Sequence, residues 1–181
     1  MKKTLLIILI LIPLLGSSQK RLGAFTGLNN SSISEGFLKE SYFTDKLGFH
    51  IGGFYEMDLS EKVKFRPKLV YSQQGNRGEY DHIIGEKLDY LNIPLNLKFY
   101  ERTYLMVGPQ IGFLVSKKNT FFFQSVKQSF DAGLNLGLGQ RIHDFFIEIN
   151  LYQGFTKAIE SRDFIKGTNT VIQLSAGVYI F

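Results

Sequence analysis

Apolar and polar residues alternate with a period of two along most of the chain. The clearest stretch is residues 62–75, with the sequence KVKFRPKLVYSQQG. One parity is apolar and the other is basic or polar: Val63, Phe65, Pro67, Leu69 and Tyr71 against Lys64, Arg66, Lys68, Ser72 and Gln74. Because successive side chains of a strand point to opposite faces, this stretch predicts a strand with one apolar and one strongly basic face.

Seven further stretches follow the same rule, and no convincing amphipathic helix lies between them. The eight predicted strands are residues 20–29, 46–58, 62–75, 87–100, 103–116, 129–142, 144–156 and 169–181. Each has about 10 to 14 residues, against roughly 5 to 6 for globular strands and roughly 9 to 11 for strands that cross a membrane. Leu88 and Tyr90 lie on the opposite phase from Leu91, so we expect a bulge near Leu91.

The connections between these strands alternate in length. Those near Ser60, Arg102 and His143 are a few residues long, whereas residues 30–45, 76–86, 117–128 and 157–168 form longer ones. Short turns at one end and long loops at the other are typical of outer-membrane barrels. The pattern predicts an all-β fold, an eight-stranded antiparallel up-and-down transmembrane β-barrel, with periplasmic termini and four long external loops.

The polar parity decides between this barrel and a soluble, ligand-binding eight-stranded barrel. It contains many glycines together with the charged residues Glu56, Lys64, Arg66, Lys68, Lys98, Asp131, Arg141 and Glu148. These residues suit a narrow lumen, because unpaired buried charges are costly and opposite charges can pair there. We expect Lys64, Arg66, Lys68 and Arg141 to pair with Glu56, Asp131 and Glu148, filling the lumen and leaving no diffusion pore.

The apolar parity is rich in aromatic residues near the strand ends, as expected for the two aromatic girdles of a membrane barrel. The residues concerned are Phe49, Tyr55, Phe65, Tyr71, Phe99, Phe113, Phe130, Phe145 and Phe155.

The N-terminus has the three regions of a secretory signal peptide. Lys2 and Lys3 precede an apolar segment, residues 5–15, and the small residues of Gly16-Ser17-Ser18 follow. We expect residues 1–18 to be removed, leaving the barrel domain at residues 19–181. Removal lowers the formal charge from +5 to +3, so the basic balance gives no indication of nucleic-acid binding.

Candidate chemistry is sparse. His50 shares the polar parity with Glu56 and Ser72, which could suggest a membrane-embedded lipid hydrolase. A nucleophile, base and orienting group must lie within hydrogen-bond reach, which parity does not show, so the sequence favours a lumen-filling histidine. His82 and His143 each neighbour an aspartate, and a metal site needs three or four converging ligands. The GLNLGLG run at residues 133–139 lacks phosphate-loop spacing and indicates barrel packing. We expect no catalytic, cofactor-binding or metal-binding residues.

One loop motif stands apart. Phe121, Phe122 and Phe123 lie in a predicted long connection, either extending a strand or forming an exposed contact patch.

Several motifs resemble those of a known family. They are Gly27-Leu28-Asn29, PKLVYSQQG at 67–75, YLNIPLNLKF at 90–99, VGPQIGFLVS at 107–116, DAGLNLGLG at 131–139 and SAGVYIF at 175–181. They resemble the outer-membrane β-barrel family of Bacteroidota, known as PorT-like or porin-family proteins. The resemblance implies an eight-stranded barrel in the cell outer membrane, and its founding member is linked to type IX secretion. Phe181 departs from the pattern, because it lies out of phase with the apolar residues of the last strand, so we expect either a bulge near Tyr179 or an inward-facing terminus.

These features together predict an integral outer-membrane barrel with no enzymatic activity and no cofactor. Its expected partners are outer-membrane lipid and other envelope proteins, reached through the long loops, and the barrel is expected to be monomeric. The alternatives are a narrow transport channel or secretion-system component, and a membrane-embedded lipid hydrolase.

Overall fold

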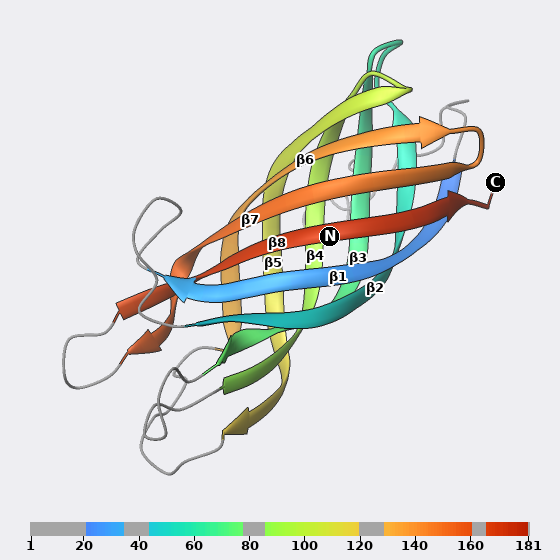
Figure 1. The fold of residues 1–181 in the computed structure, drawn as a ribbon. Coiled ribbons are helices and arrows are strands. Elements are labelled where there is room, and N and C mark those ends of the chain that lie inside the picture. The colour runs from blue at the N-terminus through green and yellow to red at the C-terminus, as the bar shows by residue number, and fades with distance from the viewer. Residues whose placement is uncertain (1–20, 35–43, 78–85, 120–128, 161–165, 181) are drawn as a thin grey trace, which may run out of the picture.

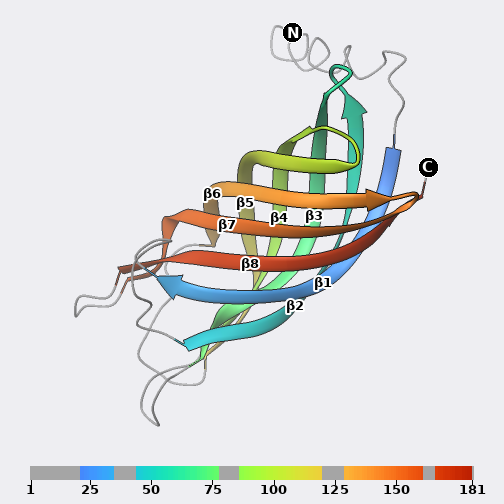
Figure 2. The ribbon, with the colours of Figure 1, turned by 45° about the horizontal axis from the view of Figure 1, so that its top comes forward.

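Eight antiparallel strands close into a single barrel in the order of the sequence (Figure 1). The computed structural model describes residues 21–34, 44–77, 86–119, 129–160 and 166–180. The strands are β1 (Arg21–Ser34), β2 (Thr44–Asp58), β3 (Val63–Arg77), β4 (Glu86–Phe99), β5 (Thr103–Asn119), β6 (Phe130–Ile142), β7 (Phe145–Glu160) and β8 (Lys166–Tyr179). β1 pairs with both β2 and β8, which closes the sheet (Figure 2). The predicted fold is therefore confirmed.

The strands are tilted and staggered, as closure of a sheet requires. A path from Tyr104 through successive register partners shows the stagger. It passes Gly139, Glu148, Ser175, Gly27, His50, Ser72 and Tyr90 and rejoins β5 at Leu114, ten residues beyond its start. This stagger brings residues that are far apart in sequence to the same level of the lumen.

Several strands run further toward the long loops than the sequence pattern indicates. β1 continues to Ser34, β5 to Asn119 and β7 to Glu160. The backbone ladder continues there although the apolar alternation stops, because strand pairing uses main-chain groups and needs no apolar face. At the other end, β8 stops at Tyr179.

The expected bulge lies on a different strand. Between β4 and β5 the register shifts so that Asp89 lies opposite Ser116 and Tyr90 opposite Leu114, which makes Val115 of β5 the extra residue. Leu88 and Tyr90 keep the lumen-facing phase and are buried. The sequence pattern was misleading because these two apolar side chains fill the lumen.

The outer face of the barrel is mainly apolar. Leucine and isoleucine side chains such as Leu134, Leu136 and Ile149 are about half exposed, as expected for a surface covered by lipid. Aromatic rings lie toward the long loops (Phe49, Tyr71, Phe113, Phe130, Phe155) and toward the short turns (Tyr55, Phe65, Phe99, Phe145). The Phe113 and Phe130 rings are 5.8 Å apart and the Phe49 and Tyr71 rings 6.0 Å apart. No helix among the described residues is long and apolar enough to cross a membrane.

For the end of β8 the sequence predicts either a bulge near Tyr179 or an inward-facing terminus, and the strand register excludes the bulge. The pairing of β1 with β8 runs without a shift from Gly23–Tyr179 to Ser34–Thr168, so no bulge lies near Tyr179. Tyr179 points into the lumen and is buried, while Ile180 is exposed. Phe181 lies outside the described residues, as do residues 1–20, for which the signal peptide stays a prediction.

Candidate functional site in the barrel lumen

A buried carboxylate on β7 holds two cations from the opposite wall of the barrel. Glu148 accepts from Arg66 Nη1 at 2.5 Å and from Lys68 Nζ at 2.6 Å, and both cations belong to β3. Tyr104 donates its hydroxyl to the same carboxylate at 2.8 Å. Because β3 and β7 face one another across the eight-stranded ring, these bonds span the lumen.

A second carboxylate completes the cluster nearer the turns. Glu56 of β2 accepts from Lys98 Nζ at 3.1 Å and from the Tyr179 hydroxyl at 3.2 Å. Its Oε2 also lies 3.6 Å from Arg66 Nε. Arg66, Lys98, Glu56 and Glu148 are each at most 1% exposed, so the cluster is dry and its charges depend on one another.

Aromatic rings pack around the central guanidinium. The Arg66 Cζ lies 3.7 Å from the centre of the Phe54 ring and 4.9 Å from that of Phe146. Arg66 Nη2 has no hydrogen-bond partner among the described residues, and contact with the ring faces supplies its attraction instead. We call Phe54, Glu56, Arg66, Lys68, Lys98, Tyr104, Phe146, Glu148 and Tyr179 the lumen plug.

Of the four cations predicted to pair with lumenal carboxylates, Arg66 and Lys68 do so and Lys64 and Arg141 do not. Lys64 and Arg141, expected to meet lumenal carboxylates, instead contact Glu101 of the β4–β5 turn, at 3.1 Å and 2.6 Å, and Lys64 also pairs with Asp58. Both cations stand at the turn end of their strands, so their side chains reach over the rim of the barrel.

Asp131 was also expected to pair with a cation. It is held by neutral groups, accepting from Asn169 Nδ2 at 2.8 Å and from the Thr156 hydroxyl. It lies toward the long loops, and no cation among the described residues pairs with it.

His50 is buried in the middle of the lumen, as the lumen-filling interpretation predicts. Its Nε2 is 2.8 Å from Ser175 Oγ, and its Nδ1 is 2.5 Å from Asn29 Oδ1. Ser72, the hydroxyl suggested by the sequence, bonds to Asn29 and Gln74 instead. Glu56 belongs to the plug and accepts from Lys98 and Tyr179, so the trio of the hydrolase alternative does not form.

The observed Ser175–His50–Asn29 arrangement has the spacing of a nucleophile, a base and an orienting group. Sequence reasoning missed Ser175 because it is 125 residues from His50, and only closure of β8 onto β1 brings it near. All three side chains are at most 2% exposed. A Cβ at Gly27 would lie 2.8 Å from the His50 ring, so no room for a substrate lies beside the imidazole on that side.

The remaining candidates lie in a turn, on β6 or outside the described residues. His143 is exposed in the β6–β7 turn, and no three His, Cys, Asp or Glu side chains among the described residues are placed to hold a metal ion. Gly133, Gly137 and Gly139 face the lumen on β6, where a Cβ at Gly139 would lie 2.3 Å from the Tyr104 ring. They allow close packing, as predicted. His82 and the Phe121–Phe123 run lie outside the described residues.

An apolar outer belt, two aromatic girdles and a filled polar lumen define an integral outer-membrane β-barrel. The family model "Outer membrane protein beta-barrel domain" matches residues 17–160, and the chain belongs to this family. It is a protein of the outer membrane, surrounded by lipid. No curated protein sequence matches the chain.

Several solved structures share the fold, among them Ail and OprG. Ail, the attachment invasion locus protein of Yersinia pestis, solved with the heparin analogue sucrose octasulfate, is 14% identical with a TM-score of 0.51. The match covers 89% of this chain and 99% of Ail. OprG from Pseudomonas aeruginosa is 12% identical with a TM-score of 0.52, over 91% of this chain and 98% of OprG. At these identities the likeness concerns the fold alone.

Proposed function

We propose that the protein is a sealed, non-catalytic barrel that anchors its long external loops in the membrane for contact with other envelope proteins. The lumen plug carries this proposal, since its ion pairs link opposite walls and its rings occupy the space between them. A lumen closed in this way leaves the outside of the barrel and the loops as the surfaces available for function.

We further propose that the protein is one of the PorT-like barrels of Bacteroidota. The motifs behind this resemblance supply much of the lumen. PKLVYSQQG contributes Lys68 and Ser72, YLNIPLNLKF contributes Asn96 and Lys98, and DAGLNLGLG contributes Asn135. All five side chains are buried, which supports a shared way of filling the barrel.

The sealed lumen predicts an absence of conductance. Purified protein reconstituted in planar bilayers is expected to give no discrete current steps at any voltage, because a path for ions would have to break the bonds of Glu148. Correct folding is checked by a difference in gel mobility between boiled and unboiled samples. Stepwise currents from folded protein would instead establish the narrow-channel alternative.

The absence of catalysis gives a second expectation. A fluorophosphonate probe, which reacts with activated serine hydroxyls, is expected to leave the folded barrel unlabelled, because Ser175 is 2% exposed. Ser175→Ala is the matched control for labelling elsewhere. Labelling of the wild type that disappears in both Ser175→Ala and His50→Ala would overturn the non-catalytic proposal and favour a hydrolase.

A further inference from the structure

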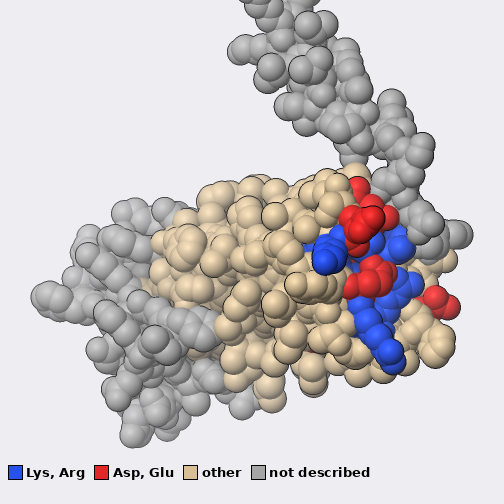
Figure 3. All heavy atoms as spheres, turned by 90° about the horizontal axis from the view of Figure 1, so that it is seen from above, with Lys and Arg blue, Asp and Glu red and all other residues tan. Residues whose placement is uncertain are grey.

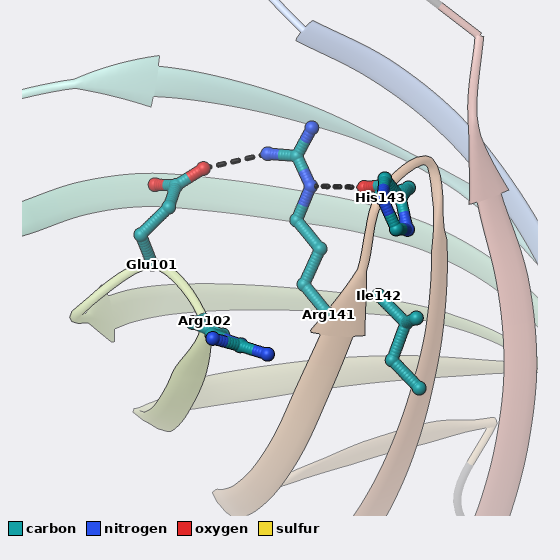
Figure 4. A pocket seen from close by; sticks show the side chains of 5 residues that line it. All are labelled: Glu101, Arg102, Arg141, Ile142 and His143. Atoms are coloured by element: carbon teal, nitrogen blue, oxygen red, sulfur yellow. Dashed lines mark hydrogen bonds and ion pairs between the residues drawn. The ribbon is translucent and has the colours of Figure 1, made fainter.

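An open pocket lies at the turn end of the barrel, between the β4–β5 and β6–β7 turns. It has a volume of about 430 Å³ and is lined by Glu101, Arg102, Arg141, Ile142 and His143 (Figure 4). Charged side chains gather at this end of the molecule, while the rest of the described surface in view has none (Figure 3). In outer-membrane barrels the short turns face the periplasm. The pocket therefore opens on the periplasmic side.

Arg141 is held rigidly beside the pocket. Its Nη1 donates to Glu101 Oε1 at 2.6 Å and its Nε to the His143 carbonyl at 2.8 Å. The guanidinium also lies over the Tyr179 ring, with Cζ 4.0 Å from the ring centre. Its Nη2 has no partner in the described parts of the chain, so a fixed donor remains for a ligand.

Glu101 does not neutralise the pocket, because its charge is already shared among three cations. Besides Arg141, Arg21 lies 2.7 Å from it and Lys64 3.1 Å. Partial burial raises the pKa of Glu101, but Lys98, Lys64 and Arg21 outweigh this effect and leave the pKa below its ordinary value. The carboxylate is therefore ionised and occupied.

Arg102 adds a positive charge that nothing in the described structure balances. Its side chain is exposed and has no hydrogen bond or ion pair with another described residue, and the same holds for the His143 imidazole. Asp144 follows His143 in the turn but does not line the pocket. Arg102 and Arg141 thus both line the pocket, and the Arg102 guanidinium has all its donors free.

The remaining wall is apolar and continuous with the lipid-facing surface. Ile142 is 55% exposed and lies directly opposite Phe145, which is 68% exposed and belongs to the turn-end aromatic girdle. Such girdles mark the level of the lipid head groups. The pocket therefore spans the boundary between hydrocarbon and water.

We propose that this pocket binds the phosphate of a phospholipid in the periplasmic leaflet, with the start of an acyl chain against Ile142 and Phe145. Guanidinium groups match phosphate oxygens in charge and in fork geometry. Basic pockets at the membrane surface recognise lipid head groups through this chemistry. A free phosphate would use the arginines but would gain nothing from the apolar wall.

Binding is measured by native mass spectrometry on the full mature chain in detergent, titrated with phosphatidylglycerol. Arg102→Gln is expected to weaken binding of phosphatidylglycerol about tenfold, because the variant loses one hydrogen bond to a charged group. Arg102→Lys should recover part of the affinity, because it restores the charge without the fork. Diacylglycerol with the same chains, which lacks the phosphate, is expected to bind weakly and equally to wild type and Arg102→Gln.

Lys62→Gln is the matched control, since Lys62 is an exposed cation of the neighbouring β2–β3 turn and does not line the pocket. It should bind phosphatidylglycerol as the wild type does. Equal affinity of wild type and Arg102→Gln, or equal losses in Arg102→Gln and Lys62→Gln, would overturn the proposal. Displacement of the lipid by inorganic phosphate at equal concentration would overturn the assignment to a lipid.

Discussion

Replacing Glu148 with glutamine is expected to destabilise the barrel by about 3–5 kcal/mol, the range for removing one partner of a buried ion pair. The amide keeps the size of the side chain but leaves Arg66 and Lys68 without their closest negative charge, 2.5 Å and 2.6 Å away. Neither cation can turn toward water, because both are buried within the plug. Urea-induced unfolding in lipid vesicles, followed by tyrosine fluorescence, measures the change in free energy.

Glu61→Gln serves as the control, because Glu61 is exposed in the β2–β3 turn and exposed charges contribute at most about 1 kcal/mol. A Glu148→Gln barrel as stable as the Glu61→Gln barrel would show that the cations find other partners. The plug would then not hold the walls together, and the case for a sealed lumen would weaken with it.

Most of the fold follows from the two-residue period of the sequence. In a strand, parity alone assigns each side chain to one face, so Arg66 and Lys68 could be placed in the lumen without knowing any contact. Strand length and the alternation of short and long connections then separate a membrane barrel from a soluble one. Both inferences depend on local pattern only.

The pairs inside the lumen could not be predicted in the same way. Which cation meets which carboxylate depends on the stagger between strands, and parity contains no information about stagger. Arg66 and Glu148 are 82 residues apart and meet because the path of register partners advances ten residues in one circuit. Glu101 was missed because it belongs to a turn, where the alternation that assigns faces has ended.

Local apolar character also gave a wrong signal at Leu88 and Tyr90. Apolar residues on the polar parity predict a change of phase, whereas here both side chains are buried in the lumen near the long loops. Narrow barrels fill their interior with side chains of any type that fit. A bulge is therefore better inferred from a lasting change of phase than from one or two residues.

Gly52 and Gly53 are adjacent residues of β2 that face opposite sides of the sheet. Alanine at each position therefore tests which side is crowded. A Cβ on Gly52 would lie 2.5 Å from the Leu69 carbonyl oxygen and 2.9 Å from the Phe25 ring, whereas a Cβ on Gly53 would meet only the Gly23 oxygen, at 3.4 Å. Neither glycine has a positive φ, so any effect of alanine arises from space. Gly52→Ala is expected to destabilise the barrel by about 1–3 kcal/mol, because β3 is bonded to β4 as well and cannot easily move away.

Gly53→Ala is expected to have no effect or to stabilise by about 0.4–1 kcal/mol, since alanine reduces the freedom of the unfolded chain. Urea unfolding in vesicles and the mobility of unboiled samples on gels compare the two variants directly. Equal stability of the two variants would contradict the assignment of Gly52 to a crowded lumen and Gly53 to the lipid face. That assignment is the one on which the orientation of every other residue in β2 depends, because successive side chains alternate between the two faces.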